Sequence, residues 1–468
     1  MIEKIISELQ RVIDKERVLW RKTDMMTYAY DASFATQLEP KEPEAVVIPL
    51  STDEVQACVQ LANKYQVPLY PRGAATGQTG GAVPIKGGIV LDMSKMDRII
   101  EVDDENFQVI VEPGIIQANL NAALKKYGLF FPPDPGSSKM CTVGGMISNN
   151  SSGLRAVKYG VTRQYVLGLE IVLPTGEVIV TGGEKSRALK SVSGYDLAHL
   201  MIGSEGTLGI VTRIRLKLLP LPPARGIVLC SFPKIEQAIE GVRAVYHSGI
   251  IPSAIEIMDI YATRAANKMR PDLNLPETEA LLLFEVDGNK DIVALQVKTI
   301  SEALKSHTDY VKFSDDPEQC ENLWQSRKIV GAAVGNLKPG GIRVYGGEDI
   351  CVPFSRLPEA IRRIHEITNS YNIVCGIYGH VGDGNLHTAP IIDINNQQEV
   401  EKAKQMIEEI HHLAIELGGT TTAEHGVGIV RAPYMEIEHG QALDVMRRLK
   451  KTLDPNNILN PGKMALPT

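Results

Sequence analysis

Short apolar segments in the first part of the sequence run into tracts of glycine. The clearest example is Val67–Pro71, which is followed directly by Arg72–Gly81, with glycines at positions 73, 77, 80 and 81. Between such segments, apolar residues recur at helical spacing, as in the stretch that begins at Ser51 with a capping box and extends to about Tyr65. Strands that alternate with helices predict an α/β or α+β domain. Glycines at strand ends predict loops whose backbone can closely approach a ligand.

The tract Arg72–Gly81 has the properties of an anion-binding loop, because its glycines expose backbone N–H groups and Arg72 and two threonines add donors. Its glycine spacing matches neither a Walker A loop nor G-x-G-x-x-G. Two further tracts, Asp134–Ser138 and Gly144–Gly153, follow it. Each could be only a tight turn. Together they favour a long ligand with a pyrophosphate and a sugar, and FAD is such a ligand.

Two histidines, His380 and His387, flank a glycine-rich turn, and Glu424 and His425 lie in a second glycine-framed turn. The glycines argue against a helix, so the histidines are expected at the two ends of a tight turn between extended segments. Two imidazoles and a carboxylate suit one divalent metal such as zinc, iron or manganese. The alternative is a pair of glycine-rich loops whose polar residues never meet.

The bulk properties exclude several classes of protein. A net charge of −7 and an aromatic content of 5% give no reason to expect nucleic acid as a partner. The six cysteines show no C-x-x-C pairing, which argues against a local iron–sulfur cluster and a disulfide framework and favours a reducing cytoplasm. The N-terminal residues have the spacing of an amphipathic helix, and no transmembrane segment is expected.

The length of 468 residues predicts two or three domains, and Pro220–Pro223 is the best boundary. Beyond it, helical patterns alternate with apolar strands such as Leu281–Val286, which suits an antiparallel sheet with helices on one face. The first domain is therefore expected to end at about residue 220. The fold class is expected to be α+β.

Five motifs occur in an order found in a known family. They are Pro71–Gly77, Phe131–Ser137, Gly203–Gly209, Gly379–His387 and Glu424–Gly428. In this order they resemble the FAD-linked oxidases of the vanillyl-alcohol oxidase superfamily, which have the PCMH-type FAD domain. The resemblance extends from about Pro43 to Met464 and is greatest to the branch that contains D-lactate dehydrogenases, D-2-hydroxyglutarate dehydrogenases and the glycolate oxidase D subunit.

The resemblance implies a two-subdomain FAD-binding domain in residues 1–220, a cap domain over the flavin in residues 221–417 and a segment, 418–468, that returns to the FAD-binding domain. It also implies a set of FAD contacts. The implied contacts are Arg72, Gly73, Ala74, Ala75, Thr76, Gly77, Thr79 and Gly80 at the pyrophosphate, Pro135, Gly136, Thr142, Gly144, Gly145, Asn149, Ser152 and Gly153 along the ADP and ribityl portions, and Glu205, Gly209 and Ile210 on the adenosine side. No histidine lies in Arg72–Gly81, where some relatives attach FAD covalently, so noncovalent FAD is expected.

The resemblance also implies that His380, His387 and Glu424 bind the metal and that His425 is the base. Chemistry adds two candidates. A substrate carboxylate favours a fork-shaped cation, and Arg327 is the candidate, with Lys328, Lys338 and Arg343 as competitors. Asn385, inside the histidine motif, could contact the flavin or the substrate.

The implied activity is metal-assisted oxidation of a small D-2-hydroxy acid, with D-lactate favoured and glycolate next. Electrons would leave the flavin for a partner such as an electron-transfer flavoprotein or an iron–sulfur subunit, because the chain has no cysteine cluster of its own. The alternatives are D-2-hydroxyglutarate oxidation, a redox-neutral FAD-dependent transferase of the same superfamily, a metal hydrolase and a non-enzymatic binding module.

Overall fold

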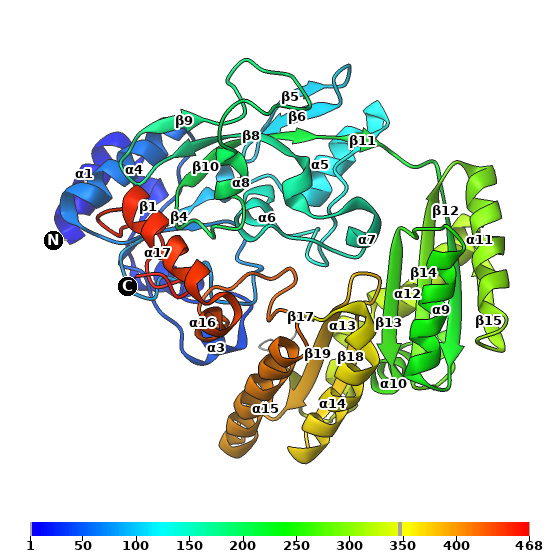
Figure 1. Ribbon diagram of the computed structural model, residues 1–468. Helices are drawn as coiled ribbons and strands as arrows, with labels where there is room; N and C mark the ends of the chain where they lie inside the picture. The colour runs from blue at the N-terminus through cyan, green and yellow to red at the C-terminus, as the bar shows by residue number, and fades with distance from the viewer. Residues whose placement is uncertain (1, 345–348, 468) are drawn as a thin grey trace. The chain divides into compact units, whose positions relative to one another are not determined.

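A computed structural model describes residues 2–344 and 349–467 and divides into two compact units (Figure 1). The first unit contains residues 1–152, 161–221 and 424–468, and the second contains residues 153–160 and 222–423. Neither unit is continuous in sequence. A short piece of the early sequence belongs to the second unit, and the C-terminal segment belongs to the first.

The first unit has a four-stranded, a five-stranded and a two-stranded sheet with helices around them (Figure 1). Its strands are β1 (Val18–Leu19), β2 (Ala45–Val47), β3 (Leu69–Arg72), β4 (Ile89–Asp92), β5 (Ile99–Asp103), β6 (Gln108–Val111), β7 (Leu129–Phe130), β8 (Val166–Val172), β9 (Val178–Val180), β10 (Ile210–Lys217) and β11 (Leu219–Pro220). Its helices are α1 (Ile2–Val12), α2 (Lys22–Met25), α3 (Phe34–Leu38), α4 (Thr52–Tyr65), α5 (Gln117–Leu124), α6 (Val143–Asn149), α8 (Leu197–Met201), α16 (Met435–His439) and α17 (Gln441–Leu453).

The two larger sheets of the first unit differ in pattern. The four-stranded sheet has the order β1-β2-β4-β3, and β2 and β3 run parallel to β4. The five-stranded sheet, β5-β6-β10-β8-β9, is antiparallel throughout. Each sheet has its own apolar core. Because β3 ends at Arg72, the parallel sheet places the loop 73–81 at the carboxyl edge of its strands.

Helix α4 illustrates how the local sequence determines an element. The Ser51 hydroxyl accepts a hydrogen bond from the Glu54 backbone N–H, which caps the first turn. Its buried side chains, Val55, Cys58, Val59 and Ala62, recur at helical spacing and join the core of the four-stranded sheet. The helix ends at Tyr65, and Gln66 takes the left-handed conformation that closes it. The predicted helix is confirmed.

The second unit is formed around one large sheet (Figure 1). Its strands are β12 (Ala224–Phe232), β13 (Ala254–Asp259), β14 (Ala280–Gly288), β15 (Tyr310–Ser314), β16 (Ile342–Arg343), β17 (Ile350–Cys351), β18 (Val374–His380) and β19 (Asn385–Ile392). Its helices are α7 (Ala156–Tyr159), α9 (Ile235–His247), α10 (Ile260–Met269), α11 (Lys290–Leu304), α12 (Pro317–Lys328), α13 (Val330–Ala333), α14 (Leu357–Ser370) and α15 (Gln397–Glu416).

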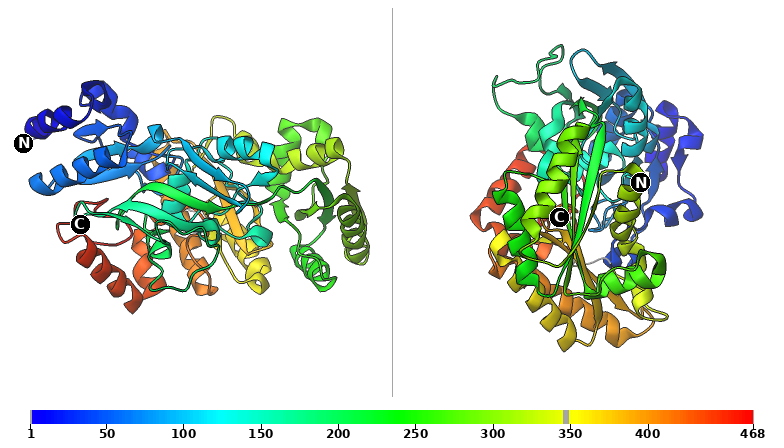
Figure 2. Two further views of the ribbon diagram at one scale, coloured as in Figure 1. Left: turned by 90° about the horizontal axis from the view of Figure 1, so that it is seen from above. Right: turned by 90° about the vertical axis from the view of Figure 1, so that its right-hand side faces the viewer.

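The strand order of this sheet is β15-β12-β14-β13-β18-β19-β16, with β17 paired to β19, and its described pairs are antiparallel. The predicted α+β class with an antiparallel sheet is confirmed, but the prediction that helices cover only one face of this sheet is wrong. Helices α9, α11, α14 and α15 pack on one face, and α10, α12 and α13 add a layer on the other (Figure 2). The second layer forms because the strands are apolar on both faces, as β14 is at Leu281 and Leu282.

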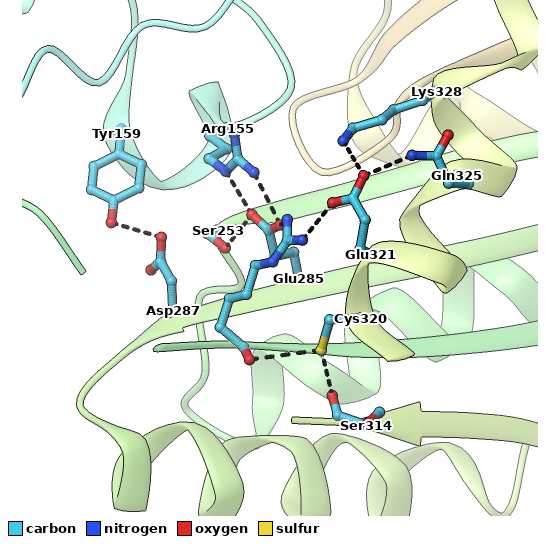
Figure 3. A network of polar contacts seen from close by, with 11 residues as sticks. Arg155, Tyr159, Ser253, Glu285, Asp287, Ser314, Cys320, Glu321, Gln325 and Lys328 are labelled. Carbon is cyan, nitrogen blue, oxygen red and sulfur yellow. Dashed lines mark hydrogen bonds and ion pairs between the residues drawn. The ribbon is translucent and has the colours of Figure 1, made fainter. Parts of the chain in front are cut away.

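Residues 153–160 are held to the large sheet by buried ion pairs (Figure 3). The Arg155 guanidinium donates to both oxygens of Glu285, at 2.6 and 3.0 Å. Lys158 and Tyr159 both donate to the carboxylate of Asp287. Glu285 and Asp287 lie on β14, so this strand of the second unit supplies the partners for α7. Two charged clusters therefore attach a segment of the early sequence to the second unit.

Among the described residues, we find no helix with both the length and the apolar character needed to cross a bilayer.

Gly226 on β12 provides a test of the packing between the sheet and α11. A Cβ at this position would lie 2.4 Å from Val297 and 2.9 Å from Val293. We expect Gly226→Ala to lower the free energy of unfolding of the second unit by about 1–3 kcal/mol, because overpacking displaces the helix. Calorimetric unfolding measures this change. The control is Gly335→Ala, where nothing lies within 4 Å of the added Cβ; an equal loss in both variants would contradict this account.

Candidate functional site

His380 and His387 are brought together by the hairpin of β18 and β19. Tyr378 pairs with His387 across the hairpin, and the Nε2 atoms of the two histidines lie 3.3 Å apart. Both side chains are buried. Glycine is required in this hairpin because a Cβ on Gly379 would lie 2.4 Å from the Asn385 carbonyl oxygen, and Gly384 has a φ of +89°. The predicted tight turn between two extended segments is confirmed.

The separation of the two nitrogens fits a pair of ligands on one metal ion. Zinc–nitrogen bonds of about 2.05 Å at a tetrahedral angle place the two ligand nitrogens about 3.3 Å apart. A ligand oxygen of Asp349 also lies within 4.8 Å of a ring nitrogen of His387. The second unit therefore offers two imidazoles and a nearby carboxylate, a donor set that fits zinc, ferrous iron or manganese.

Glu256 on β13 is the buried partner of His380, and the sequence analysis missed it. Its Oε1 lies 2.6 Å from His380 Nδ1, and its Oε2 accepts a hydrogen bond from Arg327 Nε at 2.5 Å. Burial disfavours the charged carboxylate, but His380 and Arg327 outweigh that effect and hold the pKa of Glu256 below its ordinary value. The signal in the sequence is a lone acidic residue in the apolar strand Ala254–Met258.

Arg327 lies in the same cluster as the two histidines. It is buried on α12, and its guanidinium lies over the ring of Tyr378, 4.8 Å from the centroid. The competing candidates Lys328 and Lys338 instead pair with Glu321 and Glu399. The structure therefore brings together three residues that the sequence singled out, His380, His387 and Arg327.

Asp349, a second buried carboxylate that the sequence analysis missed, orders the segment before Glu424. One of its oxygens accepts from Asn385 Nδ2 at 3.0 Å. The other accepts from the Thr422 hydroxyl at 3.0 Å and from the Ala423 backbone N–H at 3.1 Å. The predicted ligand Glu424 is the next residue in the chain. Asn385 is thus occupied through its amide nitrogen, whereas its Oδ1 is buried and has no partner among the residues described.

In the first unit, the loop after β3 presents its backbone. Among the hydrogen bonds of the described chain, none is donated by the backbone N–H groups of residues 74–78. Ala75 has a φ of +52°, which turns the chain sharply within the loop. The sequence suggested that Arg72 donates hydrogen bonds to an anion, but in the structure its guanidinium contacts backbone carbonyl oxygens. Its buried guanidinium donates to the carbonyl oxygens of Thr27 and Tyr30, at 3.3 and 3.0 Å, and burial lowers its pKa.

Glu205 connects two of the glycine motifs inside the first unit. Its carboxylate accepts hydrogen bonds from the backbone N–H groups of Val427 and Gly428, at 2.6 and 2.8 Å. The side chain is buried, and this burial raises its pKa despite the two bonds. Glu205 therefore fixes the turn that directly follows Glu424 and His425.

The C-terminal segment stabilises the same region. The buried ammonium of Lys463 donates to the carbonyl oxygens of Gly80 and Val83, both at 2.6 Å. Asn460 donates to the carbonyl oxygens of Gly81 and Glu205, at 3.0 and 2.6 Å. The loop 73–81 and the Glu205 turn thus share partners that are more than 250 residues away in sequence.

Glu424 and His425 start the last segment of the first unit. Glu424 Oε2 accepts a hydrogen bond from the Ser152 hydroxyl at 3.0 Å, and Glu424 Oε1 lies 3.7 Å from His425 Nε2. The His425 carbonyl accepts from Asn149 Nδ2 at 3.2 Å. Ser152 and Asn149, both predicted FAD contacts, therefore lie beside the predicted metal ligand and base.

The other predicted FAD contacts divide into two groups. At three of these positions close packing requires glycine. A Cβ on Gly73 would lie 2.2 Å from Thr142, one on Gly144 would lie 2.6 Å from Pro113, and one on Gly209 would lie 2.5 Å from Ile171. Ile210 is part of the apolar core. Gly136 is open, with nothing within 4 Å of an added Cβ, and Gly153 belongs to the second unit.

Comparison with known proteins gives two family matches and close relatives. Residues 43–182 match the FAD binding domain, and residues 221–464 match the C-terminal domain of FAD linked oxidases. The chain is 40% identical to glycolate oxidase subunit GlcD of Bacillus subtilis, over 99% of this chain and 97% of the relative. It is 37% identical to the mitochondrial cytochrome-type D-lactate dehydrogenase of Arabidopsis thaliana, over 99% of this chain and 82% of the relative.

Solved structures share the fold at lower identity. 4-Ethylphenol oxidase from Gulosibacter chungangensis matches with a TM-score of 0.81 at 20% identity, over 99% of this chain and 97% of that one. An alkyldihydroxyacetonephosphate synthase matches with a TM-score of 0.78 at 22% identity, over 98% and 85%. The two domains and their motifs define an FAD-dependent oxidoreductase. This chain belongs to the family of FAD-linked oxidases, and the predicted resemblance is confirmed.

The residues of the first unit fit an FAD molecule. The backbone N–H groups of residues 74–78 are available donors of the kind that phosphate oxygens accept, and the left-handed turn at Ala75 brings them to one loop. The loop is held from behind, because Asp31 accepts from the Gly80 N–H at 2.8 Å and Lys463 binds the Gly80 carbonyl. A loop fixed in this way is preorganised for a diphosphate.

Glu205→Gln tests whether the Glu205 turn supports flavin binding. An amide presents one acceptor and one donor, so one of the two backbone N–H groups at 427 and 428 loses its partner. We expect a loss of about 1–3 kcal/mol in the free energy of unfolding and a lower ratio of flavin to protein absorbance after purification. The control is Glu112→Gln, at a buried glutamate that pairs with Arg98. Full flavin retention in Glu205→Gln would contradict a supporting role.

Proposed function

We propose that the protein oxidises a small D-2-hydroxy acid to the 2-oxo acid, with D-lactate as the favoured substrate and glycolate next. The observation that carries this proposal is the buried cluster in which the Nε2 atoms of His380 and His387 lie 3.3 Å apart beside the guanidinium of Arg327. The cluster offers metal ligands and a carboxylate-binding group together. The printed names of the relatives, a glycolate oxidase subunit and a D-lactate dehydrogenase, support the same substrate class.

In this proposal the first unit would hold FAD noncovalently, and the bound flavin would supply the hydride acceptor for the substrate carbon. His380, His387 and Glu424 are the residues that would hold a divalent metal, whose chemistry would be to lower the pKa of the substrate hydroxyl. His425, whose Nε2 lies 3.7 Å from Glu424 Oε1, would accept the hydroxyl proton. Asp349 supports this role by ordering Thr422 and Ala423, the residues that precede Glu424.

Arg327 is proposed to bind the substrate carboxylate. Its Nε is occupied by Glu256, and among the residues described neither of its terminal Nη nitrogens donates to another group. The Nη pair is the end of the guanidinium that binds a carboxylate in the bidentate mode. Lys328 and Lys338 are less suitable because their ammonium groups already pair with Glu321 and Glu399.

D-2-Hydroxyglutarate is a second candidate substrate, and Arg343 is the observation that favours it. The guanidinium of Arg343 lies over the Tyr378 ring, 5.4 Å from its centroid, and Arg327 lies over the same ring at 4.8 Å. A second guanidinium beside Arg327 could bind a distal carboxylate.

The electron acceptor is proposed to be a partner protein, an electron-transfer flavoprotein or an iron–sulfur subunit. A cluster bound by this chain would need several cysteines grouped together. The chain instead has six scattered cysteines, of which only Cys351 is partly exposed.

The test is anaerobic stopped-flow absorbance near 450 nm with D-lactate, L-lactate, glycolate and D-2-hydroxyglutarate in separate experiments. We expect D-lactate to bleach the flavin and a chelator to abolish the bleaching, with recovery when Zn²⁺ or Mn²⁺ is restored. Faster bleaching by D-2-hydroxyglutarate would select the second candidate. A bound flavin that none of the acids reduces would favour redox-neutral chemistry instead.

His425→Ala is expected to slow flavin reduction at saturating D-lactate by ~10²–10⁴-fold, because it removes the proton acceptor. The measurement is the limiting rate of bleaching at 450 nm. His199→Ala in the same unit is the control, since His199 is 38% exposed and pairs with Asp196 at the surface. Equal rates for His425→Ala and the unaltered protein would remove His425 from the proposal.

Arg327→Lys is expected to raise the KM for D-lactate by roughly 10–100-fold, because a point charge replaces a bidentate fork worth about 1.5–3 kcal/mol. Steady-state kinetics with an artificial acceptor measures the change. Arg225→Lys is the matched control. Like Arg327, Arg225 pairs with a buried glutamate, in this case Glu285, but it lies outside the histidine cluster. A similar KM in both variants would argue against carboxylate binding by Arg327.

A further inference from the structure

Glu256 lies where one carboxylate can act on two functional groups. It is 1% exposed, and in the sheet it pairs directly with His380 on the neighbouring strand β18. Its side chain points to the same face as Ala254 and Met258, the face that α12 covers. Arg327 reaches the carboxylate from that helix. Burial of a carboxylate is costly unless it is paired, and this carboxylate has a partner on each oxygen.

The contact with His380 determines which nitrogen of the ring carries the proton. An ionised carboxylate can only accept a hydrogen bond, so Nδ1, 2.6 Å from Oε1, must be the donor. The lone pair is then on Nε2, the atom that lies 3.3 Å from His387 Nε2. A carboxylate behind a histidine ligand fixes both the tautomer and the ring orientation.

The contact with Arg327 determines how the guanidinium is presented. Oε2 accepts from Nε at 2.5 Å, and the ring of Tyr378 supports the guanidinium plane at 4.8 Å from its centre. The group is therefore held along one edge and one face. What remains for an anion is the end formed by the two Nη nitrogens, which is the edge that binds carboxylates in the bidentate mode.

We propose that Glu256 is a positioning residue that prepares both the metal ligand His380 and the substrate-binding Arg327 through a single carboxylate. This inference rests on the proposed function, because it takes His380 as a ligand and Arg327 as an anchor. It adds a physical link between the two, since any displacement of the carboxylate changes the metal affinity and the affinity for the substrate carboxylate together.

The same sheet provides a matched control for a purely structural role. Glu285 on the adjacent strand β14 is also 1% exposed and also forms an ion pair, with Arg155 at 2.6 Å (Figure 3). Its other partners are the Arg225 guanidinium, at 3.7 Å, and the Ser253 hydroxyl, at 3.2 Å. Glu256→Gln and Glu285→Gln therefore each remove a buried charge that pairs with arginine, but only Glu256 also contacts a histidine.

The experiment compares both variants as full-length holoenzymes. Zn²⁺ affinity is measured by competition with a chromophoric chelator, and KM and kcat for D-lactate are measured in parallel. We expect Glu256→Gln to weaken Zn²⁺ binding by roughly 10–100-fold and to raise KM, because an amide can accept from only one of the two donors. Glu285→Gln is expected to keep the Zn²⁺ affinity of the unaltered protein. Equal Zn²⁺ affinity in all three proteins would overturn the inference.

A second measurement needs no folded variant of Glu256, no metal and no substrate. Nitrogen-15 NMR of labelled histidine in the metal-free unaltered protein reports the tautomer of His380, assigned by loss of its signal in His380→Gln. We expect the proton on Nδ1. A proton on Nε2 with a bare Nδ1 would overturn the inference. If the proton is on Nδ1 but the unaltered protein binds no Zn²⁺, the proposed metal role fails while the orientation of His380 by Glu256 stands.

Discussion

A carboxylate inside a protein is stable only where hydrogen-bond donors meet its oxygens, and much of this structure is arranged around that requirement. Glu205 in the first unit receives two backbone N–H groups, and Glu256 and Glu285 in the second receive arginines. In each case the partners come from distant parts of the sequence. The buried charges therefore determine which loops, helices and strands meet, and the glycine motifs depend on them for a fixed shape.

The elements and the class of fold could be predicted from local patterns. Apolar spacing and a capping residue located α4, and glycines that leave room for close backbone contacts indicated the turn between His380 and His387. The ordered motifs indicated the FAD-linked oxidase family, because their spacing reflects a ligand-binding backbone. The closeness of two histidines seven residues apart is a local property, because a single hairpin brings them together.

Local patterns in the sequence could not predict which residues contact His380 and Arg327. Glu256 meets His380 across 124 residues and Arg327 across 71, and only the register of the sheet and the placement of α12 determine these contacts. The contacts of Asp349 could not be predicted for the same reason, because its partners are distant in the sequence. Arg72 shows the opposite effect: a basic residue at the start of a glycine loop suggested an anion ligand, whereas its guanidinium satisfies the carbonyl oxygens of Thr27 and Tyr30. A side chain's type is visible in the sequence, but its nearest polar neighbour is not.

The return of residues 424–468 to the first unit has a consequence for synthesis on the ribosome. Lys463 reaches the carbonyl of Gly80 across 383 residues, and Asn460 reaches that of Gly81 across 379. The loop 73–81 therefore leaves the ribosome long before its supporting contacts exist. The second unit, apart from residues 153–160, is continuous from 222 to 423, so its internal contacts can form earlier during synthesis. The first unit can therefore complete the support of this loop only after residues 460 and 463 have left the ribosome, later than the contacts within residues 222–423 can form.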